Sequence, residues 1–112
     1  MAKYVTYHDD DCPCIYVREV IEGNKATAQQ WDYTKNDWVT TAWAWRILAQ
    51  HDDKKTYIPE ENVDSYIQAS RKNDAELIAK LKPVEEVLDG ATRERDKNGR
   101  FIEPREWEEW ND

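Results

Sequence analysis

The stretch I-Y-V-R-E-V-I-E-G-N-K-A-T-A-Q-Q-W-D-Y-T-K-N-D-W-V, residues 15–39, decides the fold of this chain. Residues 15–21 alternate with a period of two, which is the period of a β-strand. One side of this strand carries Ile15, Val17 and Ile21, and the other carries Tyr16, Arg18 and Val20. Gly23 and Asn24 tolerate a positive φ better than other residues, so they predict a turn into a second strand over residues 27–33.

The polar residues 34–37 predict another turn, which leads back into Trp38 and Val39. Trp31, Tyr33 and Trp38 would then lie close together across a hairpin, where facing aromatic pairs contribute about 0.2–1 kcal/mol each. Trp and Tyr suit interfaces because each carries a polar group on an apolar body. We therefore expect these three residues to belong to a partner-binding surface.

Local patterns on both sides of this stretch extend the prediction. Residues 3–7, K-Y-V-T-Y, are rich in β-branched and aromatic residues and predict a first strand. Residues 42–50 are ambiguous between strand and helix, but their alanines, with Thr40 or Thr41 as an N-cap, favour a short helix. Residues 56–58 predict another short strand or an extended link.

Helical signals dominate after residue 58. A proline followed by two glutamates predicts the start of a helix over residues 59–70. Asn73 and Glu76 fit a capping box, which places the start of the next helix near Asp74. Proline in a helix interior loses a hydrogen bond, so we expect a kink or a new short helix over residues 83–89.

The order of these elements predicts the fold class. Strands followed by helices are typical of an α+β fold, and 112 residues suffice for one domain. We predict an N-terminal antiparallel sheet of three or four strands, followed by two or three helices and a C-terminal tail. Residues 1–90 would form the single domain, and residues 91–112 an acidic, Trp-containing tail.

The tail carries the segment E-W-E-E-W at residues 106–110. Trp107 and Trp110 are three positions apart and would share one face of a helical turn, flanked by Glu108 and Glu109. Two interpretations stay open at this point. The tryptophans either fold back onto the core of the protein or dock into a groove on another protein.

Net charge limits the classes of partner. The chain has 24 acidic and 16 basic residues, a formal net charge of −8, and no basic arm or patch. Binding to a phosphate backbone needs a concentrated positive surface, so direct nucleic-acid binding is disfavoured. An acidic surface instead suits another protein with a basic surface, although it also serves solubility.

Location follows from what the sequence lacks. The first residues contain no apolar run typical of a secretion signal, and no stretch of about 18 apolar residues could cross a membrane. Cys12 and Cys14 are the only cysteines, which is not the framework of a secreted disulfide-stapled domain. We expect a cytoplasmic protein with no membrane contact, in the host cytoplasm if a phage encodes it.

Catalytic and cofactor motifs are not recognisable in this sequence. Its three glycines build no phosphate-binding loop, and there is no G-x-S-x-G motif. We therefore predict a protein that is not an enzyme and needs no cofactor. The residue types that could bind a metal are His8, Cys12, Cys14 and His51, but a single residue between the two cysteines does not match the usual zinc spacing.

These observations together favour a small, acidic, non-enzymatic protein-interaction module. It would act as an inhibitor or adaptor of the kind that phages and mobile elements encode. One alternative is a structural or assembly subunit, such as a virion component, whose tail clasps a neighbouring copy. Another is a mimic of nucleic acid that blocks the basic cleft of a defence nuclease.

Overall fold

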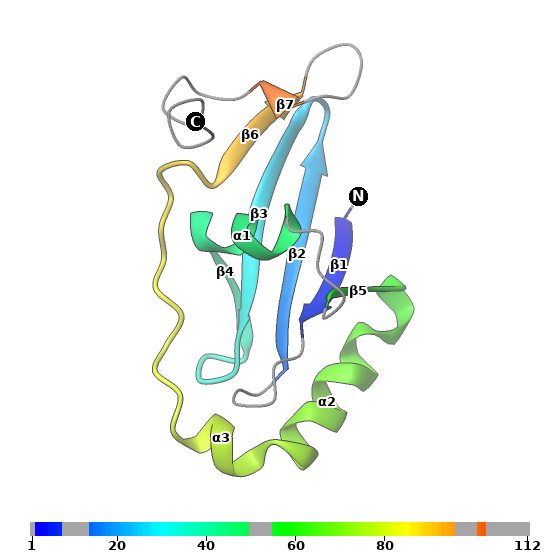
Figure 1. The fold of residues 1–112 in the computed structure, drawn as a ribbon, viewed down its shortest axis with the longest axis vertical. Helices are drawn as coiled ribbons and strands as arrows, with labels where there is room; N and C mark the ends of the chain where they lie inside the picture. The colour runs from blue at the N-terminus through cyan, green and yellow to red at the C-terminus, as the bar shows by residue number, and fades with distance from the viewer. Residues whose placement is uncertain (1, 8–13, 50–54, 96–100, 103–112) are drawn as a thin grey trace.

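A computed structural model describes residues 2–7, 14–49, 55–95 and 101–102 of the chain (Figure 1). Their centre is one antiparallel sheet. Its strands are β1 (Ala2–Tyr7), β2 (Ile15–Glu22), β3 (Lys25–Asp32), β4 (Asp37–Thr40), β5 (Lys55–Ile58), β6 (Thr92–Arg95) and β7 (Phe101–Ile102). The order across the sheet is β5-β1-β2-β3-β6-β7, and β4 shares one edge of β3 with β6.

The predicted α+β class and the antiparallel meander are confirmed. The expected count of three or four strands is wrong, because the sheet has seven strands. Strands β5 and β6 come after intervening helices and pair with β1 and β3, and no local pattern shows such long-range pairing. Residues 92–95 and 101–102, assigned to the tail from sequence, are strands of this sheet, whereas residues 103–112 lie outside the described residues.

Two turns of the meander form where the sequence predicts them. Gly23 has a φ of 61° and links β2 to β3, and Asn36 has a φ of 57° between β3 and β4. Gly and Asn reach this left-handed region with the smallest steric cost. The register of β2, β3 and β4 depends on these turns, because a shift by one residue would move every side chain of a strand to the opposite face.

The strand alternation of residues 15–21 divides the sheet into two faces. Val17 is fully buried on the face that also carries Val5 and Ala28. Tyr16 is buried on the opposite face, with Ile58. Both faces of the sheet therefore contribute to a core.

Short helices cover the first face. They are the 3-10 helix η1 (Ala42–Ala44) and α1 (Trp45–Leu48), and the side chain of Thr41 caps η1 by accepting a hydrogen bond from Trp43 N. Trp45 is buried against this face and donates its indole N–H to Ala91 O at 2.8 Å. The predicted helix over residues 42–50 is thus confirmed as far as Leu48.

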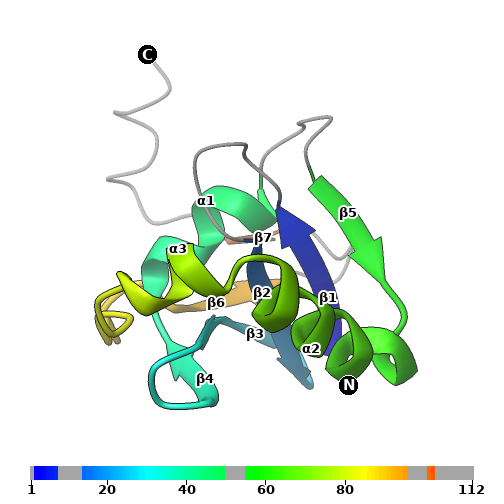
Figure 2. The same ribbon diagram turned by 90° about the horizontal axis from the view of Figure 1, so that it is seen from below.

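The second face meets the elements η2 (Glu60–Asn62), α2 (Val63–Asn73) and α3 (Ala75–Ala79). Figure 2 shows α1 and α2 on opposite sides of the sheet, and Figure 1 shows α2 near its lower end. The capping-box prediction is wrong, because residue 74 is the N-cap of α3 and makes no side-chain capping bond. The Asp74 carboxylate instead accepts a hydrogen bond from Cys14 N.

The segment from residue 83 to 89 also differs from the prediction of a kinked or new short helix. It is extended, and Val87 forms a parallel bridge with Thr41. Ala42 N donates to Val87 O at 2.9 Å and Val87 N donates to Thr40 O at 3.2 Å. These bonds satisfy backbone groups that a helix would have satisfied internally.

Among the described residues, no helix is long and apolar enough to cross a membrane.

Candidate binding face

One row of side chains crosses four strands on the second face. Tyr4 pairs with Arg18, Arg18 with Gln29, and Gln29 with Thr40. Paired residues of neighbouring strands project from the same side of a sheet, so these four side chains stand side by side. All four are half-buried.

Arg18 is held in this row by two neighbouring side chains, those of Gln29 and Trp38. Its Nε donates to Gln29 Oε1 at 2.6 Å, and Gln29 Nε2 donates in turn to Thr40 Oγ1 at 3.0 Å. The guanidinium carbon lies 4.6 Å from the centre of the Trp38 ring, which is a cation–π distance. Arginine in solution has about 2 kcal/mol of side-chain entropy, part of which these contacts have already removed.

Trp38 is the aromatic centre of this face. Its ring centre lies 5.4 Å from that of Trp31 and 5.7 Å from that of Tyr4, with the planes inclined at 70° and 60°. Both are edge-to-face arrangements, which the ring quadrupole favours. We call Tyr4, Arg18, Trp31 and Trp38 the aromatic–arginine cluster.

The sequence-based prediction that Trp31 and Trp38 lie close across a hairpin is confirmed, since they are paired residues of β3 and β4. Tyr4 and Arg18 were not predicted as site residues. The alternation of residues 15–21 places Arg18 on one side with Tyr16, so an arginine in mid-strand was a usable signal. The contact of Tyr4 with Trp38 had no such signal in the sequence, because it depends on the order of four strands.

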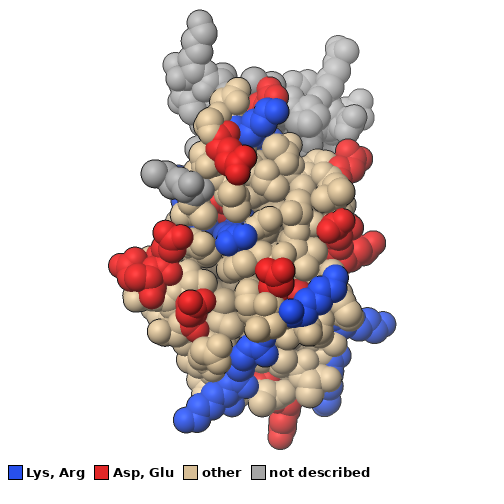
Figure 3. Space-filling model, turned by 180° about the vertical axis from the view of Figure 1, so that it is seen from behind, with Lys and Arg blue, Asp and Glu red and all other residues tan. Residues whose placement is uncertain are grey.

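Figure 3 shows the side of the molecule that faces away from α1. Uncharged residues make up most of the middle of this side, and acidic and basic side chains lie interspersed over the rest. No single sign of charge covers it. The dispersed charge inferred from the sequence therefore has a counterpart on this surface.

Tyr33, the third predicted contact residue, lies mostly inside the protein, with 8% of its surface exposed. Its hydroxyl donates to Cys14 O at 2.7 Å, and the guanidinium carbon of Arg71 lies 5.4 Å from its ring centre. Burial raises the pKa of the Tyr33 hydroxyl well above its ordinary value. We therefore leave Tyr33 out of the candidate contact surface.

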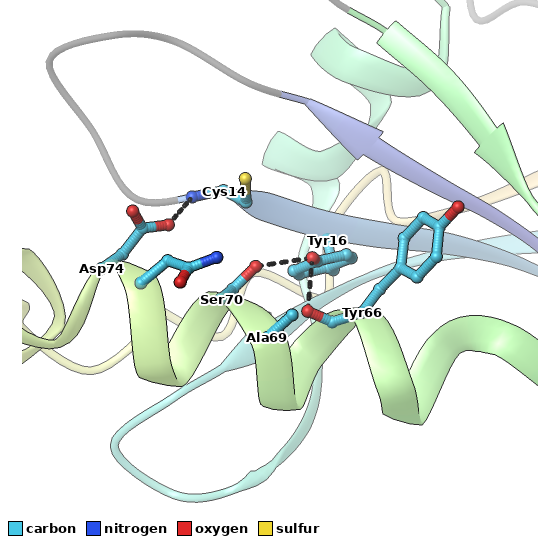
Figure 4. Close-up of a pocket in the computed structure, with 7 residues that line it drawn as sticks. Cys14, Tyr16, Tyr66, Ala69, Ser70 and Asp74 are labelled. Carbon is cyan, nitrogen blue, oxygen red and sulfur yellow. Dashed lines mark hydrogen bonds between the residues drawn. The ribbon is translucent and has the colours of Figure 1, made fainter.

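A cleft of about 290 Å³ lies between the start of β2 and α2 (Figure 4). It is lined by Cys14, Tyr16, Tyr66, Ala69, Ser70, Asn73 and Asp74. Tyr16 Oη donates to Tyr66 O at 2.9 Å, so the 2.6 Å bond to Ser70 Oγ has Ser70 as its donor. Both hydroxyl protons are thus committed to structural hydrogen bonds.

Burial raises the pKa of Tyr16, which keeps the phenol protonated near neutral pH. Neither hydroxyl is aligned as a nucleophile with a histidine base among the described residues. The arrangement joins α2 to the sheet, since two side chains from opposite elements share a buried bond. We assign this cleft a structural role.

The remaining predicted residues fall into two groups. Cys14 is half-buried, and the described residues contain no cluster of three or more His, Cys, Asp or Glu side chains that could hold a metal ion. The other metal candidates, His8, Cys12 and His51, lie outside the described residues, as do the tail residues Trp107, Glu108, Glu109 and Trp110. Their roles stay predictions.

Further aromatic side chains reach the surface away from the cluster. Trp43, Tyr57 and Tyr66 are exposed, Trp43 with the guanidinium of Arg46 at 4.5 Å from its ring centre. The sequence analysis did not single out these three as contact residues. Trp43 and Arg46 form a second arginine–tryptophan pair on the surface, which serves below as a control.

No family model, no curated protein and no solved structure matches this chain.

Proposed function

We propose that this protein is a small non-enzymatic interaction module, an inhibitor or adaptor that binds a partner protein through the second face of its sheet. The observation that supports this proposal is the aromatic–arginine cluster, which is ordered by its own contacts and half exposed. Trp, Tyr and Arg are the residue types most enriched among energetically dominant interface residues. Rigid side chains lose little further entropy when a partner binds.

The net charge of the chain favours a partner protein with a basic surface. A net charge of −8 attracts a partner with a basic surface and speeds its encounter, while contacts at the cluster would determine specificity. A mimic of nucleic acid would need carboxylates in rows on one face, and Figure 3 shows interspersed charges instead. Docking through aromatic residues is therefore better supported than mimicry.

A blocking substitution tests the proposal. Thr27 precedes Gln29 by two residues on β3 and so lies on the same face, half-buried. The Thr27→Arg variant should bind a partner recovered with the wild-type protein at least about tenfold more weakly, because one bulky side chain disturbs the packed centre of an interface. Isothermal titration calorimetry would measure the affinity.

The matched control is Ala49→Arg, at an exposed position directly after α1, which covers the opposite face of the sheet. This variant adds the same charge and a similar bulk, and we expect the wild-type affinity. Equal weakening by both variants would point to charge in general rather than to this face. Unchanged binding by Thr27→Arg, with a folded protein, would refute the proposal.

The alternative of a self-assembling subunit has one supporting observation. β5 pairs only with β1, so its outer edge has no partner among the described strands, and Tyr57 on it is 64% exposed. Exposed edge strands can pair with a second chain. Sedimentation equilibrium distinguishes the two functions, since a dimer that Tyr57→Lys dissociates would favour assembly.

A further inference from the structure

Arg18 makes no ion pair with a carboxylate among the described residues. The chain has 24 acidic residues and 16 basic ones, yet the Arg18 side chain contacts only Gln29 and Trp38 among the described residues. Its two Nη atoms donate no hydrogen bond to a described residue, and neither of them is a buried atom. A half-buried guanidinium thus presents two solvent-accessible donor groups.

The neighbours of Arg18 orient its charge without neutralising it. Gln29 is a neutral amide that accepts from Nε, and the Trp38 face contacts the flat side of the guanidinium. The end of the fork, formed by the two Nη atoms, is the part left over. That geometry matches the two oxygens of a carboxylate, which can accept two parallel hydrogen bonds.

We propose that Arg18 anchors one carboxylate, the side chain of an aspartate or glutamate on the partner protein. This inference rests on the proposed function, because it names the group that the second face recognises. Arg18 supplies the positive charge that a carboxylate needs, and the rings of Tyr4 and Trp38 suit the apolar groups that surround an acidic side chain in a peptide. A polyphosphate backbone fits less well, because the net charge of −8 repels it while one guanidinium attracts it.

A small carboxylate tests the anchor independently of any partner. Sodium acetate is titrated into ¹⁵N-labelled protein against sodium chloride at equal ionic strength, and the Nε–H signal of Arg18 and the indole N–H signal of Trp38 are followed by NMR. We expect a saturable shift with acetate and a smaller one with inorganic phosphate. Absence of a saturable shift, or a larger effect of phosphate, would overturn the inference whatever the partner is.

Two variants remove the anchor in different ways. Arg18→Lys keeps the charge and loses the planar fork, whereas Gln29→Glu places an internal carboxylate at the position of the Gln29 amide and neutralises Arg18. Both should abolish the acetate shift of the Trp38 indole signal, which is present in both variants, and thermal unfolding shows whether each remains folded. The matched control is Arg46→Lys, which makes the same change in the Arg46–Trp43 pair; it should leave the shift at Arg18 intact.

Selection from a library of random dodecapeptides extends the test to a protein-like ligand. Peptides bound by the wild-type protein should share one Asp or Glu, and Arg18→Lys should weaken them at least about tenfold, since hydrogen bonds to charged groups are among the stronger ones in proteins. Changing the shared residue to Asn or Gln should cost the wild type as much and the Arg18→Lys variant clearly less, because the lysine keeps the charge but not the two parallel hydrogen bonds. That non-additivity is the signature of a direct pair.

The outcomes separate the inference from the proposed function. One outcome is that selected peptides bind the Thr27→Arg variant more weakly than the wild type and bind the Arg18→Lys variant with unchanged affinity. That result would overturn the carboxylate anchor and leave the binding face standing. Selected peptides without a shared acidic residue would do the same. A saturable acetate shift with no peptide or partner bound at this face would support the anchor and count against the proposed protein-binding function.

Discussion

Replacing Asp32 by asparagine should destabilise the protein in a way that depends on pH. Asp32 is buried, with 1% of its surface exposed, at the end of β3. Its Oδ1 accepts from Thr34 N at 2.8 Å and Thr34 Oγ1 at 2.6 Å, and its Oδ2 accepts from Val84 N at 3.2 Å. The carboxylate therefore joins the β3–β4 turn to the extended segment that precedes β6.

The size of the effect follows from these bonds. Asparagine can keep one oxygen for the Thr34 donors, but its NH₂ group then faces Val84 N and leaves that N–H without an acceptor. A buried unsatisfied donor costs about 1–3 kcal/mol, and a charged acceptor contributes about 1 kcal/mol more per bond than a neutral one. We expect the free energy of unfolding to fall by about 2–4 kcal/mol at pH 7, measured by urea denaturation.

The pH dependence has a definite sign. Burial of Asp32 favours its neutral form, but the hydrogen bonds from Thr34, Val84 and Lys35 outweigh burial and lower its pKa. A depressed folded-state pKa contributes stability that is present above the unfolded value of about 4 and is lost as the pH falls through the folded value. The difference between wild type and Asp32→Asn should therefore shrink when unfolding is measured at a pH below 4.

The matched control is the residue that pairs with Asp32 across the same hairpin. Asp37 is exposed, and its Oδ1 accepts from Trp38 N at 2.8 Å. Asp37→Asn should change the free energy of unfolding by less than about 0.5 kcal/mol, as is usual for surface substitutions. A cost of Asp32→Asn that equals this control, or that stays the same from pH 7 to a pH below 4, would refute the reasoning.

Four further outcomes are expected. Burial raises the pKa values of Tyr16 and Tyr33, so spectrophotometric titration should show their phenols ionising at a higher pH than the other tyrosines. The stability that the two buried phenols confer should be complete below about pH 10 and decline above it. Gly90→Ala should destabilise by about 1–2 kcal/mol, because φ is +81°. Gly23→Ala, at a φ of +61° and with nothing within 4 Å of the added Cβ, should cost a similar amount in urea denaturation; a much smaller loss at either glycine would contradict a backbone origin. Trp45→Phe should cost about 1–3 kcal/mol in thermal unfolding, since it removes the indole hydrogen bond to Ala91 O, which keeps its bond from Ala28 N, and replaces the buried indole by a smaller ring. An unchanged midpoint would argue against that reasoning.

The sequence by itself determined those elements of this protein that depend on interactions between residues close together in the chain. The period of two in residues 15–21, the turn at Gly23 and the pairing of Trp31 with Trp38 could all be predicted, because each depends on residues close together in the chain. The N-cap at Thr41 belongs to the same class. These features suffice for the α+β class and for half of the aromatic–arginine cluster.

Only the tertiary structure decided which elements meet. Residues 83–89 fit a helix by their local pattern, yet Val87 bonds to backbone groups beside β4, a choice that depends on the distant partner available there. Tyr4 joins Trp38 only because β1, β2, β3 and β4 lie in that order, and Tyr33 is buried because it contacts the start of β2. Exposure and side-chain contacts between distant strands are properties of the assembled sheet, which is why Arg18 became visible as a site only there.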